Sequence, residues 1–364
     1  MSTHILHVVG ARPNFMKAAP VQRALNGLGF SQSLVHTGQH YDANMSDVFF
    51  RELDLPELDV NLAVGSGSHA QQTAQIMAGF EPVVLERRPD LVMVYGDVNS
   101  TMAAALVCAK LQIPVAHVEA GLRSNDRSMP EEINRLLTDQ LADFLFTPSE
   151  DGDRNLTREG IPSERIHLVG NVMIDTLVRL LPRALEKKKD GLPARYALVT
   201  LHRPSNVDDP EVLRRILTAM LAVSKDLAVV FPAHPRTRQR MTQFGVAADA
   251  LHVCDPLPYL EFLALQAGAT AVLTDSGGIQ EETTFLGVPC LTLRDNTERP
   301  VTVEIGTNTL IGNEPGRLRD ELAKILDGRY KKGAIPALWD GHAAERIAQV
   351  LKEKVSPRLQ ATEP

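Results

Sequence analysis

The stretch Ala271-Val-Leu-Thr-Asp-Ser-Gly-Gly-Ile-Gln-Glu-Glu282 joins a short apolar run to a helix-like run through three small residues, 276–278. This order predicts a strand, a tight turn and a helix, the unit from which parallel α/β sheets are built. Glycine lets the backbone approach a ligand closely, and the N–H groups at a helix start favour phosphate. Glu282 follows one turn later, where a carboxylate can accept from both hydroxyls of a ribose. The stretch therefore indicates a nucleotide or nucleotide-sugar site, although an ordinary strand–helix connection capped by Ser276 fits the same residues.

Length and composition indicate a globular protein with more than one domain. A chain of 364 residues is too long for one ordinary hydrophobic core, so two domains are expected. Hydrophobic residues make up 44% of the chain and charged residues 23%, which are proportions of a water-soluble globular protein. The net charge of −7 argues against nucleic acid as a main partner, since that usually needs a basic face.

The cysteines and the N-terminus favour a cytoplasmic location. Cys108, Cys254 and Cys290 lack the spacing of metal ligands, so we expect buried thiols in a reducing compartment and no metal site. Residues 1–10 are typical of a first strand and not of a signal peptide. No apolar run approaches the ~18 residues of a membrane span, so no association with a membrane is expected.

Short apolar runs alternate with amphipathic segments along the chain. The runs are rich in Val and Leu, as expected of strands that are buried on both faces. We predict strands over residues 5–10, 33–38, 91–97, 115–121, 144–149, 166–171, 197–202, 228–234, 251–255, 271–276, 289–295 and 307–311. We predict helices over residues 16–28, 69–86, 100–111, 131–142, 210–223, 317–326 and 341–355. Such alternation predicts parallel sheets joined by right-handed crossovers.

A break near residues 171–192 divides these elements into two sets. We therefore predict an α/β fold of two Rossmann-like, doubly wound parallel-sheet domains that face a cleft. The first domain is predicted over residues 1–171 and carries the candidate acid–base residues. The second is predicted over residues 172–355, with a final helix that can pack back on the first domain. Residues 356–364 are expected to form a tail.

Polar residues gather where predicted strands end, which is where open parallel sheets bind ligands. Arg12 and Lys17 follow the first strand and can hold an anion, although ordinary surface cations would give the same pattern. Asp97 stands at the end of another strand. Since Asn99 and Ser100 can both cap the next helix, Asp97 is predicted to be available for another role.

Two further carboxylates have both structural and catalytic interpretations. Glu119 ends a predicted strand, where a carboxylate is unfavourable unless it faces a cleft or is paired, and Arg123 is its expected partner. Glu131 opens a predicted helix. Ser128 and Glu131 match a capping box, and Glu131 with Arg135 makes an i,i+4 pair.

Histidines follow two predicted strands of the second domain. His202 comes just past an apolar strand and is a candidate acid or phosphate donor. His234 lies between prolines, where it can simply order a loop. Three carboxylates and a histidine at strand ends around one cleft are typical of an acid–base site: Asp97, Glu119, Glu131 and His202.

The segments at these strand ends resemble the non-hydrolysing UDP-N-acetylglucosamine 2-epimerases. The resemblance runs in order from about residue 5 to residue 312, and its most specific strings are His117-Val-Glu-Ala-Gly-Leu-Arg123 and Asp275-Ser-Gly-Gly-Ile-Gln-Glu-Glu282. The other matching strings are Gly10-Ala-Arg-Pro13 with Lys17, Thr37-Gly-Gln-His40, Tyr95-Gly-Asp97, Pro130-Glu-Glu-Ile-Asn-Arg135, Gly170-Asn171, His202-Arg203 and Arg294-Asp-Asn-Thr-Glu-Arg-Pro300.

The resemblance implies a two-domain fold like that of glycosyltransferase B enzymes, with UDP bound mainly by the second domain. It implies an isomerase that inverts C2 of UDP-N-acetylglucosamine (UDP-GlcNAc) to give UDP-N-acetylmannosamine (UDP-ManNAc), without a metal or another cofactor. We also expect a homodimer. By likeness, Asp97, Glu119, Glu131 and His202 form the acid–base set. The other positions implied for the nucleotide-sugar site are Arg12, Lys17, Phe262, Ser276, Gly277, Gly278, Glu282 and Arg299.

The chemistry implied by the resemblance accounts for these residue types. The C2 hydrogen is not next to a carbonyl, so UDP is expelled while a base removes the C2 proton, which gives a 2-acetamidoglucal. UDP then adds again after protonation from the other face. Two faces of the sugar need two proton-transfer groups with tuned pKa values. The departing diphosphate needs cations and a helix N-terminus, roles suited to Arg12, His202 and the turn 276–278.

The chain also departs from the family pattern. Leu257 stands where several members have glutamine, which leaves the uracil contact of Phe262 open. Some members bind a second UDP-GlcNAc as an activator near Gln39 and His40, but the sequence that follows differs here. Segments 42–46 and 127–131 are reminiscent of members that act on UDP-2,3-diacetamido-2,3-dideoxy-glucuronic acid. That substrate, a UDP-sugar glycosyltransferase of the same fold, a hydrolysing epimerase and a non-catalytic nucleotide-sugar sensor remain alternatives.

Overall fold

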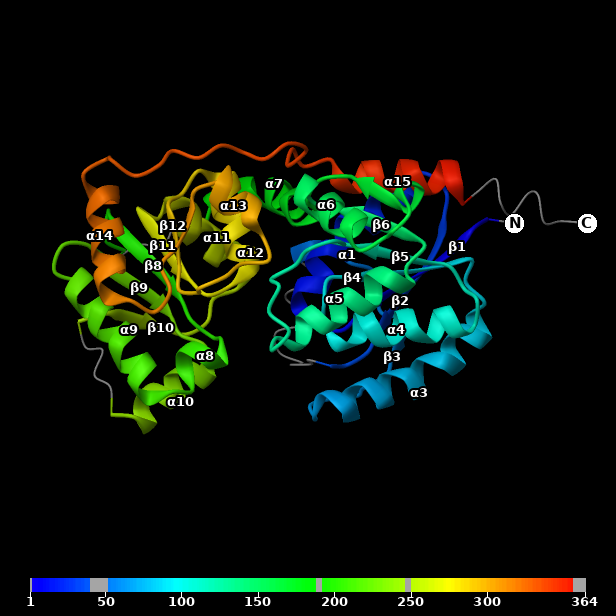
Figure 1. The fold of residues 1–364 in the computed structure, drawn as a ribbon, viewed down its shortest axis with the longest axis horizontal. Coiled ribbons are helices and arrows are strands. Elements are labelled where there is room, and N and C mark those ends of the chain that lie inside the picture. Colours follow the sequence, from blue (N-terminus) through cyan, green and yellow to red (C-terminus); the bar gives the residue numbers. More distant parts are fainter. Residues whose placement is uncertain (1, 40–51, 188–191, 246–249, 356–364) are drawn as a thin grey trace, which may run out of the picture. The chain divides into compact units, whose positions relative to one another are not determined.

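The computed structural model describes residues 2–39, 52–187, 192–245 and 250–355. The chain divides into two compact units. The first unit comprises Met1–Val178 together with Ala337–Pro364, and the second comprises Arg179–Pro336. Each unit is built on one parallel sheet with helices packed around it (Figure 1).

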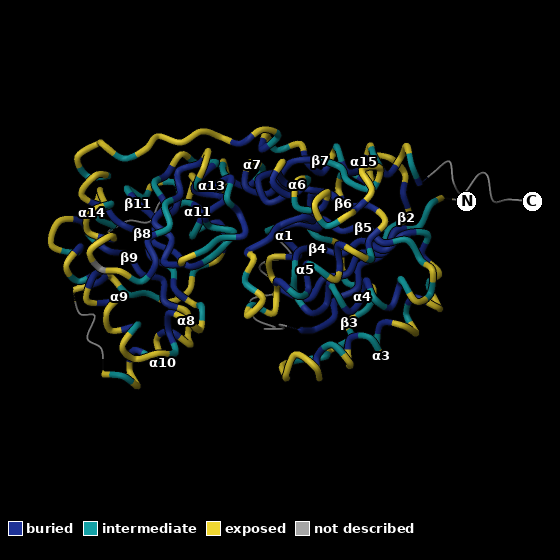
Figure 2. Tube along the Cα trace, in the orientation of Figure 1, coloured by how far each residue is buried: buried dark blue, intermediate teal, exposed yellow. Residues whose placement is uncertain are grey.

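The first unit contains a seven-stranded parallel sheet in the order β3-β2-β1-β4-β5-β6-β7. The chain moves outward from β1 through β2 to β3 and then returns to the other side of β1 to form β4, so the winding reverses between β1 and β4. The central strands are buried because helices cover their apolar side chains (Figure 2). The strands are β1 His4–Val9, β2 Ser31–His36, β3 Val60–Asn61, β4 Leu91–Tyr95, β5 Val115–Val118, β6 Phe144–Thr147 and β7 Ile166–Leu168.

The second unit repeats this arrangement with a six-stranded parallel sheet in the order β10-β9-β8-β11-β12-β13. Its winding reverses between β8 and β11, which are adjacent and pair Thr200 with Thr274. Ligands bind beyond the carboxyl ends of strands at such reversals, so the loops after β8 and β11 are candidate binding loops. The strands are β8 Tyr196–Thr200, β9 Ala228–Pro232, β10 His252–Cys254, β11 Ala271–Thr274, β12 Cys290–Thr292 and β13 Asn308–Leu310.

Amphipathic helices connect the strands and cover the sheets. Within the described residues, none of them combines the length and apolar character needed to span a bilayer. Those up to the boundary between the units are α1 Arg12–Asn26, α3 His69–Arg87, α4 Asn99–Lys110, α5 Pro130–Leu141, α6 Glu150–Arg158 and α7 Val172–Leu185. Those that follow are α8 Pro204–Val207, α9 Pro210–Val223, α10 Pro235–Gln243, α11 Tyr259–Gly268, α12 Gly277–Leu286, α13 Pro300–Glu304, α14 Pro315–Leu326 and α15 Ala343–Lys354.

The C-terminal helix α15 belongs to the first unit, where it packs against α1. The indole N–H of Trp339, which is 2% exposed, donates to the carbonyl of Pro148 at 2.9 Å. The carboxylate of Asp175 accepts from the N–H groups of Ala343 and Ala344 at 3.1 and 2.7 Å. A carboxylate at a helix N-terminus is favourable, so these contacts anchor α15 to the first unit.

The predicted fold class of two doubly wound parallel sheets is confirmed, and every predicted strand is present. Among the strands of the described residues, β3 is the one that the sequence pattern misses, because two residues are too few for a periodic signal. Predicted strand 91–97 ends at Tyr95, because Gly96 turns the chain with a φ of 64°. Helix α1 begins at Arg12, earlier than predicted, because Pro13 suits the first turn of a helix.

The division into units differs in detail from the predicted ranges. The boundary follows Val178 inside α7, whereas the predicted boundary follows Asn171. The segment from Ala337 onward returns to the first unit. The predicted tail 356–364 lies outside the described residues.

A buried histidine makes stability depend on pH. His7 in β1 is 0% exposed, and its Nδ1 and Nε2 lie 2.6 Å from the Tyr95 hydroxyl and 2.8 Å from Gln32 Oε1. Burial lowers the pKa of His7 from 6.5 to about 4. Between these values the unfolded chain binds a proton that the folded chain does not. The free energy of unfolding is therefore expected to fall as pH drops from 6.5 to about 4, with a His7 contribution of roughly 3 kcal/mol.

Urea unfolding at pH 7 and pH 4.5 measures this dependence. Replacing His7 with Gln should flatten it, while replacing the exposed His252 with Gln should leave it unchanged. The partly buried His167 also has its pKa lowered to about 4 by burial, so some dependence should persist in the His7→Gln variant. If the free energy of unfolding changed equally with pH in the wild type and in His7→Gln, the pH dependence could not be assigned to His7.

Candidate active site

Glu119 lies directly after β5, where the backbone leaves the sheet. Its φ of 77° is in the left-handed region, a conformation that costs roughly 1–3 kcal/mol and clusters at functional sites. The residue is 6% exposed, and its side chain forms an ion pair with Lys17 of α1. The prediction that Arg123 pairs with Glu119 is wrong, because Arg123 pairs instead with Asp139 and Glu159 at 2.7 and 2.6 Å.

The turn after β4 encloses the pair formed by Lys17 and Glu119. At Gly96, which has a φ of 64°, an added Cβ would lie 3.0 Å from Lys17 Nζ and 3.1 Å from Glu119 Oε2. Glycine is therefore favoured by both conformation and space. Asn14 of α1 donates to the carbonyl of Tyr95 at 2.7 Å, which ties the start of α1 to the end of β4.

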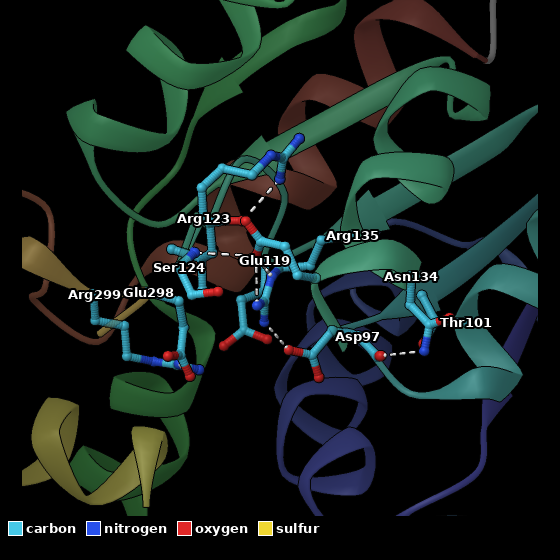
Figure 3. A network of polar contacts seen from close by, with 12 residues as sticks. Asp97, Thr101, Glu119, Arg123, Ser124, Asn134, Arg135, Glu298 and Arg299 are labelled. Atoms are coloured by element: carbon cyan, nitrogen blue, oxygen red, sulfur yellow. Dashed lines mark hydrogen bonds and ion pairs between the residues drawn. The ribbon is translucent and has the colours of Figure 1, made fainter. Parts of the chain in front are cut away.

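Asp97 follows the same turn and also contacts a buried cation. The guanidinium of Arg135, from α5, pairs with Asp97 (Figure 3). It also pairs with Glu132, whose Oε2 lies 2.7 Å from Nη2. Glu132 also accepts from the backbone N–H groups of Ser124 and Asn125 at 3.0 and 2.8 Å. Burial would raise the pKa of Glu132, but these amides and Arg135 together lower it. Arg135 is therefore held by Glu132 while it contacts Asp97.

The structure contradicts both structural interpretations of Glu131. The predicted capping box is wrong, because Met129 is the N-cap without a side-chain bond and Ser128 Oγ donates to Asp126 at 2.6 Å. The predicted pair with Arg135 is also wrong, because Arg135 is buried whereas Glu131 is exposed. Glu131 lies in the first turn of α5, with its side chain open to solvent.

The caps predicted for α4 are not used either. The N-cap of α4 is Val98, without a side-chain bond, and Asn99 is the first helical residue. Ser100 Oγ donates to Gln39 Oε1 at 2.7 Å. Gln39, near which some family members bind an activator, is 6% exposed and tied to the start of α4. His40, its predicted companion, lies outside the described residues.

A buried network that the sequence pattern does not reveal supports β5. His117 Nδ1 lies 2.6 Å from Asp139, and His117 Nε2 donates to the carbonyl of Gly96 at 2.8 Å. Burial would raise the pKa of Asp139, but His117 and Arg123 lower it. The network ties β5 to the turn after β4. His117 and Arg123 stand in a specific string, whereas nothing marks Asp139 in the middle of a helical pattern.

The first unit thus brings four predicted site residues to one edge of its sheet. Lys17 pairs with Glu119, and Asp97 follows the glycine that packs against this pair. Arg12 is exposed at the start of α1. Strand β4 pairs with both β1 and β5, so the loops after these strands leave the same edge. Carboxylates there can transfer protons, and cations there can hold an anionic group.

In the second unit, the chain after β11 has the predicted strand–turn–helix form. β11 ends at Thr274 and α12 begins at Gly277. Ser276 is the N-cap, but its side chain makes no capping bond, so the predicted capping alternative is not seen. Ser276, Gly277 and Gly278 are partly exposed. The first N–H groups of a helix have no intrahelical partner, so this turn suits an anion.

A buried ion cluster lies beside this turn. Arg299 lies 2.8 Å from Glu281 and 2.5 Å from Glu298, and Arg294 lies 2.7 Å from Glu298. A Cβ on Gly277 would lie 2.5 Å from Arg299 Nη1, so glycine is needed for Arg299 to reach this place. Burial would raise the pKa of Glu298, but Arg299 and Arg294 hold it well below its ordinary value. The sequence predicted Arg299 but gave no sign of its partner Glu298.

Glu282 lies one turn into α12, as predicted, and is 2% exposed. The hydroxyl of Tyr259 donates to its Oε1 at 2.8 Å. Tyr259 and Phe262 both belong to α11, which packs against α12. Phe262 is partly buried against a cluster that contains Tyr196 and Leu198.

His202 follows β8, and its side chain is 50% exposed. The N–H groups of His202 and Arg203 donate to the carboxylate of Asp275 at 3.1 and 2.9 Å. The sequence pattern assigned no role to Asp275, which is 0% exposed. His234 accepts from the N–H of Arg236 at 3.3 Å as the N-cap of α10, which agrees with its interpretation as a loop-ordering residue.

The three cysteines differ in burial. Cys108 and Cys290 are buried, as predicted, while Cys254 is only partly buried. Across the part of the chain that the structure describes, no three His, Cys, Asp or Glu side chains are grouped as metal ligands.

Known proteins resemble this chain over most of its length. The profile of a family described as UDP-N-acetylglucosamine 2-epimerase matches residues 23–352. A UDP-N-acetylglucosamine 2-epimerase from Methanocaldococcus jannaschii is 42% identical over 360 residues, which cover 94% of this chain and 97% of that protein. A crystal structure of the M. jannaschii UDP-GlcNAc 2-epimerase in complex with UDP-GlcNAc and UDP has a TM-score of 0.89 at 42% identity and covers 96% of this chain and all of that one.

A relative with a different name is equally similar. The UDP-2,3-diacetamido-2,3-dideoxy-D-glucuronate 2-epimerase from Pseudomonas aeruginosa is 42% identical over 357 residues, which cover 95% of this chain and 99% of that protein. Both relatives are 2-epimerases of UDP-sugars by name, so the comparisons agree on an isomerase. With two Rossmann-like sheets and the matched segments at their strand ends, the chain belongs to the UDP-N-acetylglucosamine 2-epimerase family.

Proposed function

We propose that this protein inverts C2 of UDP-GlcNAc and thereby interconverts it with UDP-ManNAc. The observation that carries the proposal is the pairing of Glu119 with Lys17 and of Asp97 with Arg135 at the ends of adjacent strands. This pairing places two carboxylates where parallel sheets bind ligands. The name of the M. jannaschii relative, and the UDP-GlcNAc and UDP in its crystal structure, support the choice of substrate.

Elimination and re-addition of UDP give these carboxylates their roles. A base takes the C2 proton as the C1–O bond to UDP breaks, which forms the C1–C2 double bond of a 2-acetamidoglucal. An acid then protonates C2 from the opposite face while UDP adds again at C1. Asp97, Glu119 and Glu131 are the proposed proton-transfer groups, because both faces of the sugar must be served.

The residues proposed to bind UDP lie mainly in the second unit. The turn at Ser276, Gly277 and Gly278 binds the diphosphate through backbone N–H groups. Glu282 accepts from the ribose hydroxyls, and Phe262 contacts the uracil. His202 and Arg299 are the further proposed binding residues of this unit. Arg12 and Lys17 are the proposed binding residues of the first unit.

The decisive experiment is NMR of UDP-GlcNAc incubated with the protein in D₂O without an acceptor. The expected result is UDP-ManNAc with deuterium at C2. Full retention of C2 protium under extended turnover would refute the elimination mechanism. Free ManNAc and UDP would indicate a hydrolysing epimerase, and a requirement for an acceptor would indicate a glycosyltransferase.

A second substrate is favoured by one observation. The P. aeruginosa relative named for UDP-2,3-diacetamido-2,3-dideoxy-D-glucuronate is as similar to this chain as the M. jannaschii relative. Running both sugars in parallel and comparing kcat/KM decides between them. A higher kcat/KM for the diacetamido sugar would identify that sugar as the substrate instead of UDP-GlcNAc. The proposed chemistry at C2 would be unchanged.

Three finer expectations belong to the same proposal. We propose a homodimer, which light scattering coupled to gel filtration tests. We propose that Gln39 and His40 take part in activation if UDP-GlcNAc is an activator, which sigmoidal kinetics in the reverse direction would reveal. We also propose a cytoplasmic enzyme, which fractionation of the source cells tests.

Replacing Glu282 with Ala is expected to weaken UDP binding by about 1.5–3 kcal/mol, the range for a lost hydrogen bond to a charged group. Isothermal titration calorimetry with UDP measures it. Tyr259→Phe is the matched control, because it removes the hydroxyl donor to Glu282 and keeps the carboxylate. Unchanged UDP affinity in Glu282→Ala would remove this residue from the proposed site.

A further inference from the structure

The loops after β8 and β11 are joined through one buried carboxylate. Asp275 follows β11 and is 0% exposed. Its Oδ2 accepts from the N–H of His202 at 3.1 Å, from the N–H of Arg203 at 2.9 Å and from Asn206 Nδ2 at 3.1 Å. Its Oδ1 lies 3.0 Å from Nδ1 of the His202 ring. Asp275 therefore holds both the backbone and the ring of His202.

The position of this carboxylate links His202 to the phosphate-binding turn. Strands β8 and β11 are adjacent and in register at Thr200 and Thr274, whose hydroxyls lie 2.7 Å apart. His202 follows Thr200, and Ser276 follows Thr274, by the same number of positions in the sequence. A rigid contact through Asp275 fixes the His202 loop against the start of α12.

The contact also decides which ring nitrogen of His202 carries hydrogen. Burial would raise the pKa of Asp275, but the His202 ring and the N–H groups around the carboxylate lower it. An ionised carboxylate only accepts, so Nδ1 of His202 must be the donor. Nε2 is then the nitrogen left to face a ligand, on a side chain that is half exposed.

We propose that Asp275 is a positioning residue that accepts from Nδ1–H of His202, so that a second hydrogen, on Nε2, is donated to the diphosphate of the bound UDP-sugar. The proposal rests on the proposed function for the identity of the ligand. A second group that fixes the tautomer and orientation of a functional histidine is a recurring arrangement in enzymes. Here the same carboxylate also fixes the backbone of the loop.

Asp275→Asn tests the proposal, because it changes hydrogen-bonding character at nearly constant shape. The backbone N–H groups of His202 and Arg203 require the amide oxygen, so the amide NH₂ faces Nδ1 of His202. Nδ1 must then accept, and the proton moves to Nε2. In histidine ¹⁵N NMR of the protein without ligand, we expect hydrogen on Nδ1 in the wild type and on Nε2 in Asp275→Asn. A wild-type His202 without hydrogen on Nδ1 would overturn the proposal, even if the variant failed to fold.

Kinetics separate positioning from a purely structural role. A ring that accepts at Nδ1 carries hydrogen on Nε2 alone and has no positive charge. Asp275→Asn should therefore lower kcat by roughly 10-fold or more and weaken UDP binding measured by calorimetry. In a His202→Ala background, Asp275→Asn should cause no further loss in either quantity, because its effect passes through His202. Additive losses would overturn the proposal.

Thr200→Val is the matched control. It removes the hydrogen bond to Thr274 at the same strand ends and leaves the His202 ring untouched, so it should change neither the tautomer nor kcat. If the wild-type protein does not epimerise UDP-GlcNAc at all, the proposed function fails. The His202 tautomer measured by NMR, and the UDP affinities of the single and double variants measured by calorimetry, still test the role of Asp275. Neither measurement needs turnover.

Discussion

Replacing Glu119 with Gln is expected to lower kcat for C2 epimerisation by roughly 100-fold or more, because an amide cannot exchange the C2 proton. A second effect follows from the geometry. Glu119 and Lys17 are both buried and paired, so the substitution leaves the ammonium of Lys17 without this partner. Breaking a buried ion pair costs about 3–5 kcal/mol, so the free energy of unfolding should fall as well.

A double variant separates the two effects. Lys17→Met combined with Glu119→Gln removes both charges, so it should recover much of the lost stability without recovering turnover. The affinity for UDP should stay near the wild-type value in Glu119→Gln, because the proposed grip on UDP lies in the second unit. Near-normal kcat in Glu119→Gln would contradict the proposed role of Glu119 in proton transfer.

Replacing Arg299 with Met is expected to lower the free energy of unfolding by about 3–5 kcal/mol, because two buried carboxylates lose their shared cation. Arg299 is 7% exposed and lies 2.8 Å from Glu281 and 2.5 Å from Glu298. Methionine fills a similar length of chain, so the loss reports charge more than packing. Affinity for UDP should fall too, because Arg299 lies beside the turn at Gly277.

The pH dependence of Arg299→Met provides an internal check. Arg299 and Arg294 overcome the effect of burial and lower the folded-state pKa of Glu298 below 4.5, so their stabilisation is present above that pH and is lost as pH falls through the folded-state value. The gap between the wild type and Arg299→Met should therefore be widest near pH 7 and should narrow below about pH 4.5. Urea unfolding at both pH values measures the gap. A constant gap would assign the loss to packing.

The elements of the fold could be predicted because their signal is local. Strands such as β4 and β11 are continuous apolar runs, since helices cover both faces of a parallel sheet. The turn after β11 could also be predicted from local sequence, because Gly277 and Gly278 lie between an apolar run and a helical pattern. The family strings lie in these local segments, so the sequence also indicated where the site residues cluster.

The partners of the buried charges could not be predicted in this way. Local spacing paired Glu119 with Arg123 and Glu131 with Arg135, but neither pair forms. The i,i+4 rule applies to two side chains on the exposed face of one helix. Glu119 precedes a turn outside any helix, and Arg135 faces the interior.

The sequence by itself determined the order of strands and helices, the turn between β11 and α12 and the positions of the candidate carboxylates, because each depends on neighbours in the chain. Only the tertiary structure decided which charges meet. Lys17 reaches Glu119 across 102 positions, and His202 meets Asp275 across 73 positions, because parallel strands bring distant loops to the same edge of a sheet. A buried charge must find an opposite charge or hydrogen bonds wherever the fold places it, and that requirement leaves no periodic mark in the sequence.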